Sequence, residues 1–226
     1  MSLVRDQILG GIRAGLKRGR LSDDATAALE ARLKEHRRNL IPARAAALDH
    51  PGQIALFERM AAEVETSIAH VASAAEVPGA VADYLSRQNL PARLVMTPDP
   101  QLDAVPWQDR PLLEIRRGVA ENGDAAGVTG CFAAIAETGT LMLVSGPATP
   151  TANNFLPDTH IVVLRAAQIL GSYEDGWERL RAAGPMPRTV NFITGPSRTG
   201  DIEQRIVLGA HGPRRLHIVL IDDADA

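Results

Sequence analysis

The segment most informative about the fold lies near the C-terminal end. It consists of Thr189-Val-Asn-Phe-Ile-Thr194 and the residues that follow, Gly195-Pro-Ser-Arg-Thr-Gly-Asp-Ile-Glu203. An apolar run enters a polar loop, and a second apolar run, Leu216-His-Ile-Val-Leu-Ile221, follows it. Polar loops that join buried strands are where α/β proteins usually place their ligand sites. The residues after the loop predict a short helix over 201–207, whose N-terminus would favour an anion.

Upstream segments extend the same pattern. Thr140-Leu-Met-Leu-Val144 and His160-Ile-Val-Val-Leu164 are continuous apolar runs of the length expected for strands buried on both faces. Shorter strands are expected at 91–97 and 112–116, and a helix from about 167 to 183. Strands that alternate with helices predict an α/β fold with a mainly parallel sheet flanked by helices.

The first 90 residues have a helical pattern and no recognisable catalytic or binding motif. Apolar residues recur four apart at Ile8, Ile12 and Leu16, and Ser22 begins a charge-laced second helix. Two more helices are predicted over 53–73 and 78–88. We therefore expect a helical N-terminal extension, residues 1–90, packed on or extending from an α/β domain, residues 91–226.

Composition narrows the classes of function. A net charge of −3 and a pI near 6.1 argue against nucleic-acid binding. No apolar run approaches the roughly 18 residues of a membrane span, and no signal pattern opens the chain, so we expect a cytoplasmic protein. One thiol, Cys131, cannot hold an iron–sulfur cluster, which needs about four ligands. No zinc-type histidine spacing occurs either, so we expect no metal and no cofactor in this chain.

The turn Glu137-Thr-Gly-Thr140 stands at the mouth of a predicted buried strand. Glycine there lets the backbone approach a ligand closely, and Glu137 would be an acid, base or nucleophile. The alternative is a turn whose acid caps backbone amides. Ligand contacts are expected from Thr138, Gly139 and Thr140 and, at the carboxyl end of the same strand, from Ser145 and Gly146.

The loop after residue 194 provides a second group of candidates. Arg198 would hold a carboxylate or phosphate, unless Asp201 and Glu203 satisfy it instead. His211 would position a proton. The ligand-binding residues predicted in this loop are Gly195, Ser197, Arg198 and Thr199. The loop matches neither a Walker motif nor a G-x-G-x-x-G fingerprint, so it does not specify a nucleotide.

Several motifs together resemble a known family, the lactate utilization protein C (LutC-type, LUD-domain) proteins, over roughly residues 90–221. They are Ala136-Glu-Thr-Gly-Thr-Leu141, Ser145-Gly-Pro147, Pro157-Asp-Thr-His-Ile161, Gly195-Pro-Ser-Arg-Thr-Gly-Asp-Ile-Glu203 and Leu208-Gly-Ala-His-Gly-Pro213. The resemblance implies a fold similar to sugar isomerases (NagB/RpiA) and CoA-transferases. It also implies a role, with two iron–sulfur partner proteins, in oxidising L-lactate to pyruvate.

Three hypotheses follow. The first is a component without an iron–sulfur cluster in an L-lactate-oxidising complex, binding a small anionic ligand between the two loops. The second is an assembly subunit whose N-terminal helices dock the iron–sulfur partners. The third is a stand-alone CoA-transferase-like or isomerase-like enzyme, because Glu137-x-Gly139-x-Leu141 is similar to the glutamate turn of some CoA-transferases, with Thr138 where asparagine is common.

Overall fold

The computed structural model describes residues 2–17, 19–202 and 205–222, and for residues 2, 199–202 and 205–208 it describes the backbone alone. The chain divides into two compact units between Leu40 and Ile41. The first unit holds two predicted helices, α1 (Ser2–Gly15) and α2 (Asp23–Glu35). Ser22 caps α2 by accepting a hydrogen bond from Ala25 N at 3.2 Å. None of the described helices combines the length and apolar character needed to cross a membrane.

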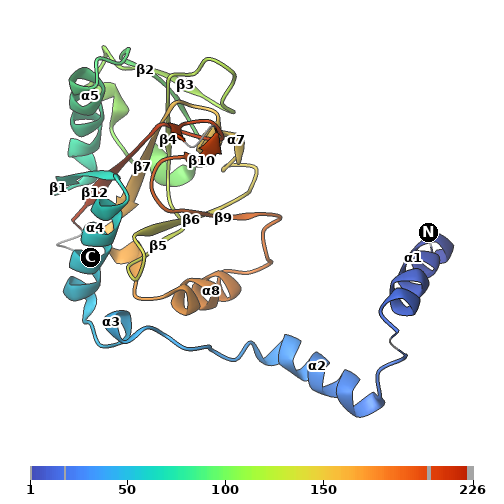
Figure 1. Cartoon of the computed structure of the whole chain (residues 1–226). Helices are drawn as coiled ribbons and strands as arrows, with labels where there is room; N and C mark the ends of the chain where they lie inside the picture. Colours follow the sequence, from blue (N-terminus) through green and yellow to red (C-terminus); the bar gives the residue numbers. More distant parts are fainter. Residues whose placement is uncertain (1, 18, 203–204, 223–226) are drawn as a thin grey trace. The chain divides into compact units, whose positions relative to one another are not determined.

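The second unit is an α/β structure (Figure 1). Its elements are α3 (Ala43–Ala46), α4 (His50–Glu63), β1 (Ser67–Val71), η1 (Ala74–Glu76), α5 (Val77–Arg87), β2 (Arg93–Met96), α6 (Pro100–Asp103), η2 (Trp107–Asp109), β3 (Glu114–Arg117), β4 (Ala126–Thr129), β5 (Ala133–Ile135), β6 (Thr140–Val144), α7 (Ala152–Phe155), β7 (Thr159–Arg165), η3 (Ala166–Gln168), β8 (Ile169–Leu170), α8 (Tyr173–Ala182), β9 (Val190–Ile193), β10 (Arg198–Ile202), β11 (Arg205–Leu208) and β12 (Arg215–Ile221).

The main sheet has six strands in the order β1-β12-β7-β4-β2-β3, and every pair in it is parallel. Along β7, Ile161 and Val163 pack with α5 on one face. Val162 and Leu164 pack on the other face, with α4 and a second sheet. The predicted parallel sheet, flanked by helices and built from strands buried on both faces, is confirmed.

The second sheet has four strands in the order β8-β5-β6-β9 and lies between the main sheet and α8. The strand β6 pairs antiparallel with both β5 and β9. The apolar run 140–144 is therefore a doubly buried strand, as predicted, but not a strand of the parallel sheet. Apolar content reports burial on two faces and says nothing about strand direction, and this is why the prediction was wrong on that point.

Two helix predictions were too long. The helix α4 ends at Glu63, the chain turns at Glu65 with φ +62°, and residues 67–71 form β1 beside β12. The sheet unit therefore starts well before residue 91, since β1 and α5 belong to it. The helix expected over 167–183 begins only at Tyr173, where Ser172 and Asp175 form a capping box.

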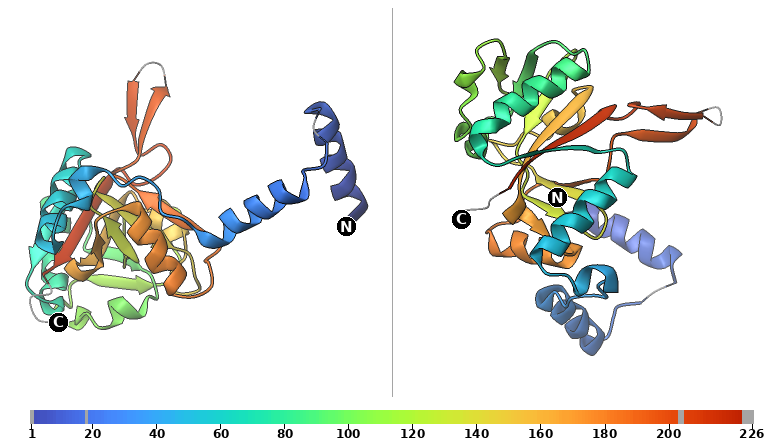
Figure 2. Two further views of the ribbon diagram at one scale, coloured as in Figure 1. Left: turned by 90° about the horizontal axis from the view of Figure 1, so that it is seen from below. Right: turned by 90° about the vertical axis from the view of Figure 1, so that its left-hand side faces the viewer.

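The helix expected over 201–207 is absent from the described backbone of that segment. There β10 and β11 pair antiparallel as a hairpin, which Figure 2 shows extending from the rest of its unit. The segment carries Thr199, Ile202, Ile206 and Val207, β-branched residues that favour strands over helices. The strand preference of these β-branched residues is the physical reason why the predicted helix is not formed.

Candidate functional site

A cavity of about 270 Å³ opens beside the loop that follows β9. It is lined by Asn154, Phe155, His160, Phe192, Ile193, Thr194, Gly195, Pro196, Ser197, Arg198, His211, Gly212, Pro213 and Leu216. His160 and Leu216 are the second residues of β7 and β12. The cavity therefore lies at the amino ends of these parallel strands, whereas ligand sites of open α/β sheets usually lie at the carboxyl ends.

Backbone hydrogen bonds hold the wall of this cavity together. Ser197 N donates to Pro213 O at 2.8 Å, and Gly209 N donates to Ser197 O at 2.9 Å. Gly195 has φ +75°, and a Cβ atom there would lie 2.5 Å from Val64 O. Only glycine fits that approach to the end of α4. The loops before and after the hairpin are thus fastened to each other and to α4.

Arg198 reaches the cavity rim from the start of β10. Its Nη2 lies 2.6 Å from Glu65 Oε2, and the two side chains are 40% and 63% exposed. An exposed ion pair of this kind contributes little to stability. The guanidinium group carries five N–H donors, so one contact with Glu65 leaves donor capacity for an anion. The acids first weighed as partners, Asp201 and Glu203, have side chains outside the described part of the chain.

His160 is a cavity residue that the sequence prediction missed. Its side chain is fully buried, and its Nε2 lies 2.8 Å from Thr129 Oγ1. Its Nδ1 has no hydrogen-bond partner among the described residues. Burial lowers the pKa of the imidazole to about 4, so the ring is neutral at pH 7. The available signal was a histidine at the start of an otherwise apolar strand, within the motif Pro157-Asp-Thr-His-Ile161.

The turn of Glu137 lies apart from this cavity. Glu137 is buried, and its Oε1 accepts a hydrogen bond from Tyr173 N at 2.9 Å, at the start of α8. This is the capping arrangement weighed as the alternative in the sequence. Gly139 has φ +63°, and a Cβ atom there would lie 2.3 Å from Ala61 N in α4. The glycine therefore allows two backbones to meet.

Four hydroxyl groups connect that turn to the cavity. Thr138 Oγ1 and Thr140 Oγ1 are 2.7 Å apart, and each lies 3.0 Å from the hydroxyl of Tyr173. Thr140 Oγ1 is also 2.6 Å from Thr194 Oγ1, and Thr194 lines the cavity. Thr140 thus contacts the site through one intervening side chain, that of Thr194, and Thr138 through two, those of Thr140 and Thr194.

The predicted ligand residues Ser145 and Gly146 make contacts within the protein backbone instead of lining this cavity. Ser145 Oγ accepts a hydrogen bond from Thr189 N at 2.9 Å, and Gly146 forms a bridge with Thr149. Both follow an antiparallel strand, so they are not at the carboxyl edge of the parallel sheet. The structure thus places Gly195, Ser197, Arg198 and His211 around one cavity; the side chain of Thr199 lies outside the described part.

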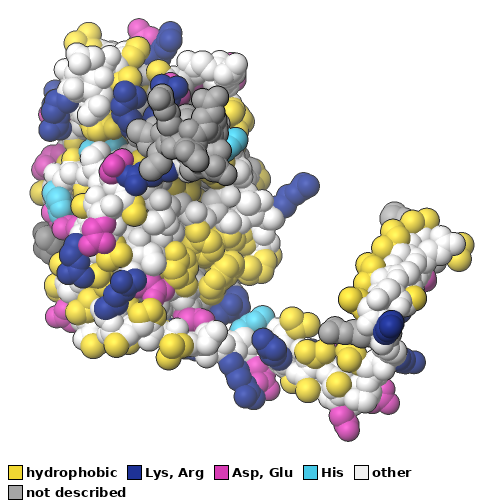
Figure 3. All heavy atoms as spheres, in the orientation of Figure 1, with side chains coloured by type: hydrophobic (Ala, Val, Ile, Leu, Met, Phe, Trp, Pro, Cys, Tyr) yellow, Lys and Arg dark blue, Asp and Glu magenta, His cyan; other side chains and the backbone are white. Residues whose placement is uncertain are grey.

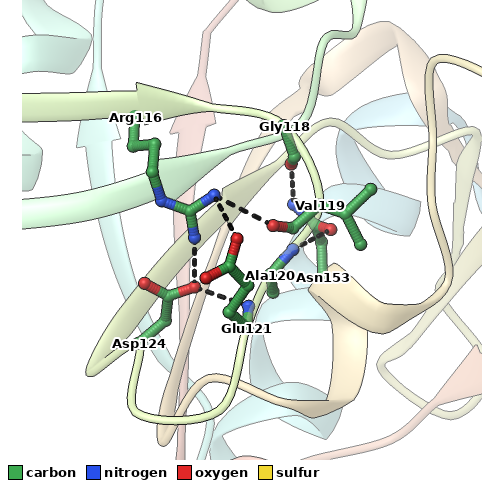
Figure 4. A network of polar contacts seen from close by, with 7 residues as sticks. All are labelled: Arg116, Gly118, Val119, Ala120, Glu121, Asp124 and Asn153. Atoms are coloured by element: carbon green, nitrogen blue, oxygen red, sulfur yellow. Dashed lines mark hydrogen bonds and ion pairs between the residues drawn. The ribbon is translucent and has the colours of Figure 1, made fainter.

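A second cavity of about 100 Å³ adjoins the first, since Asn154 lines both. The neighbouring Asn153 anchors α7 by donating to Gly118 O and accepting from Ala120 N, each at 2.9 Å (Figure 4). In the same view, Arg116 pairs with Asp124, which makes it part of a surface network.

Cys131 lines this second cavity and is buried. Its Sγ lies 2.9 Å from Ala133 O, and burial raises the thiol pKa to about 12. A packed, protonated thiol matches this environment. Among the residues that the structure describes, no three His, Cys, Asp or Glu side chains gather as a metal site would require.

Comparison with known proteins gives a consistent result. The LUD-domain family profile matches residues 54–221. A protein named Lactate utilization protein C from Deinococcus radiodurans is 35% identical over 174 residues, which is 73% of this chain and 77% of that protein. A protein of the same name from Geobacillus sp. (strain WCH70) is 33% identical over 101 residues, which is 43% of this chain and 42% of that protein.

A solved structure is also similar. The crystal structure of a DUF162 family protein from Deinococcus radiodurans superimposes with a TM-score of 0.59 and 29% sequence identity. The match covers 77% of this chain and 99% of that one.

Proposed function

Because this chain belongs to the LUD-domain family, we propose that it is a component of an L-lactate utilization system, the one without an iron–sulfur cluster. The names of its relatives support the role in lactate utilization. In this proposal, partner proteins carry the iron–sulfur clusters and move the electrons. This chain binds a small anionic ligand in the cavity beside Arg198.

The observation that carries the ligand proposal is the meeting of three polar groups at one cavity. Ser197 comes from the loop before the hairpin, Arg198 from the start of β10 and His211 from the loop after β11, and all three line the cavity. A guanidinium group and a hydroxyl group are the usual partners of a carboxylate. Arg198 would hold the anion, Ser197 would donate a hydrogen bond, and His211 would hold or release a proton at the rim.

Glu137 has a weaker claim to a direct role. Its carboxylate accepts the N–H of Tyr173 and is not among the groups that line this cavity. Chemistry at Glu137 in this cavity would require the carboxylate to reach a space that its residue does not line. We therefore assign proton handling in this proposal to His211.

The first test uses Arg198→Ala in the full chain, with Arg117→Ala as the matched control. Arg117 is 49% exposed and paired with Asp103, so the control removes an arginine of similar exposure and pairing from the main sheet. Titration with L-lactate and pyruvate should show roughly 10- to 100-fold weaker binding for Arg198→Ala only, because a charge-assisted hydrogen bond is lost. Equal binding by wild type and Arg198→Ala would refute the anion site.

The second test concerns the partners. The tagged chain would be purified anaerobically from its own host grown on L-lactate, and the eluate assayed for iron, acid-labile sulfide, flavin and lactate oxidation. Iron-bearing partners with activity support the proposal. A colourless chain without activity contradicts the complex.

One observation favours the assembly role as a second candidate. The helix α1 exposes a row of apolar side chains spaced four apart, Val4, Ile8 and Ile12, at 64%, 58% and 51% exposure. Figure 3 shows hydrophobic side chains along this helix. Such a stripe is stabilised when a partner covers it. Deleting residues 1–40 should abolish partner association, with circular dichroism showing that residues 41–226 stay folded. Retained association contradicts this role.

A further inference from the structure

We propose that His160 is a ligand-binding residue of the Arg198 cavity and that its Nδ1–H donates to the 2-oxygen of a short 2-hydroxy or 2-oxo carboxylate. Arg198 and Ser197 hold the carboxylate of the same ligand. The inference rests on the proposed function, since it names the class of anion that the cavity accepts.

The position of His160 makes it part of the cavity rather than of the core. It sits in β7 between Gly127 of β4 and Leu216 of β12, and Leu216 lines the cavity with it. It is fully buried, in a strand whose next four residues are apolar. A buried polar group normally has a hydrogen-bond partner. A ring nitrogen that lacks one among the described residues, in a residue that lines a cavity, therefore points to a ligand.

The hydrogen bond to Thr129 indicates which ring nitrogen carries the proton. Thr129 is 3% exposed, and its Oγ1 lies 2.8 Å from His160 Nε2. If Thr129 donates, its only hydroxyl hydrogen is satisfied and the proton of the neutral ring lies on Nδ1. If it accepted from Nε2 instead, a buried hydroxyl hydrogen would need another acceptor. Thr129 is thus a positioning residue that makes Nδ1 a donor.

The walls of the cavity define the rest of the ligand. Phe155, Phe192 and Leu216 are apolar, whereas Ser197 and Arg198 are polar. A ligand that satisfies all of them has a carboxylate, an acceptor oxygen close to it and a small apolar substituent. The volume of about 270 Å³ is several times that of a water molecule, roughly 30 Å³, so a three-carbon acid fits together with ordered water.

The chain contains a matched control in His217. This histidine is also buried, at 3% exposure, and its Nδ1 lies 2.8 Å from Ser67 Oγ. Its Nε2 likewise has no partner among the described residues. Its ring stacks on Tyr84 at a centroid distance of 3.8 Å. His217 is not among the residues that line the Arg198 cavity, and in β12 its side chain points to the sheet face opposite that of Leu216. A ligand in the cavity should therefore affect His160 and leave His217 unchanged.

The experiment uses the full chain labelled with ¹⁵N-histidine, and three probes: L-lactate, pyruvate and propionate. Propionate has the same carboxylate and number of carbons but lacks the 2-oxygen. We expect the free protein to hold His160 as the Nδ1–H tautomer. L-Lactate or pyruvate should then shift its ring signals but not those of His217. At least one of the two should bind about fivefold or more tightly than propionate, the ratio expected from one neutral hydrogen bond.

Two substitutions separate the ring nitrogens. In His160→Asn the amide nitrogen occupies the place of Nδ1, so the preference over propionate should persist. In His160→Gln the amide nitrogen occupies the place of Nε2, so the preference should vanish. His217→Gln should bind all probes as wild type does. If His160→Gln does not fold, the histidine tautomer and the probe preference measured on the wild-type protein still test whether His160 Nδ1–H donates to the ligand.

The outcomes distinguish this inference from the proposed function. Equal binding of all three probes, weakened by Arg198→Ala, overturns the role of His160 and leaves the anion site standing. An Nε2–H tautomer in the free protein also overturns the inference alone. Failure of every probe to bind overturns both.

Discussion

Replacing Gly139 with alanine should destabilise the sheet unit, although the residue lies in a turn rich in acid and hydroxyl groups. Its φ of +63° is costly for alanine, by about 1–2 kcal/mol. The added Cβ would lie 2.3 Å from Ala61 N and 2.6 Å from Met60 C, both backbone atoms of α4, which must shift. Overpacking of this kind adds about 1–3 kcal/mol. We expect a loss of about 3 kcal/mol in the free energy of unfolding.

Urea titration followed by tryptophan fluorescence measures the effect. Gly123→Ala is the control because Gly123 has φ +99°, and a Cβ atom added there would meet nothing within 4 Å. It should show the backbone part alone, about 1–2 kcal/mol. If both variants lose the same stability, the close approach to α4 is not what Gly139 serves. The sequence-based expectation that Gly139 lets the backbone approach a ligand closely would then be the better explanation.

Three further predictions concern buried groups. Burial lowers the pKa of His160 and His217 from 6.5 to about 4. Between pH 6.5 and 4 the unfolded chain therefore binds more protons than the folded chain. The free energy of unfolding should fall by about 3 kcal/mol per histidine as pH drops through this range. Urea midpoints at pH 7.5 and 4.5 measure this, and a His160→Asn variant that loses as much as wild type would contradict it. Because burial raises the thiol pKa of Cys131 to about 12, a thiol reagent at pH 8 should react only after unfolding; rapid reaction with the native chain would show an accessible thiolate. Glu137→Gln keeps an acceptor for Tyr173 N and should cost below about 1 kcal/mol, whereas Glu137→Ala should cost about 1–3 kcal/mol in thermal unfolding; equal losses would argue against the capping role.

Local sequence was a good guide where one residue type carries the signal. The apolar runs that became β7 and β12 are buried on both faces, as their composition predicted. The helix α5 lies within one residue of the range predicted for it at each end. Ser22 caps α2 through its own hydroxyl. In each case the information lies in neighbouring residues, so periodicity and capping rules could find it.

Local sequence failed where a distant segment decides the conformation. Residues 67–71 form β1 because β12 pairs with them, some 150 positions later in the chain. The run 140–144 is antiparallel because β5 and β9 are its neighbours. Spacing along the chain cannot tell which strand will lie beside another, so these assignments needed the tertiary structure.

The candidate site divides in the same way. The sequence by itself determined the family, the parallel α/β architecture and the chemical character of the loop that carries Ser197 and Arg198. Only the tertiary structure brought His211 to that loop and separated Glu137 from it. It also placed His160 in the cavity wall with its buried Nδ1 lacking a partner among the described residues. The physical reason is that residue type and spacing encode burial and local hydrogen bonding. A cavity, in contrast, is made by packing between segments that are distant in the chain, and no local pattern records which of their atoms will lack a partner.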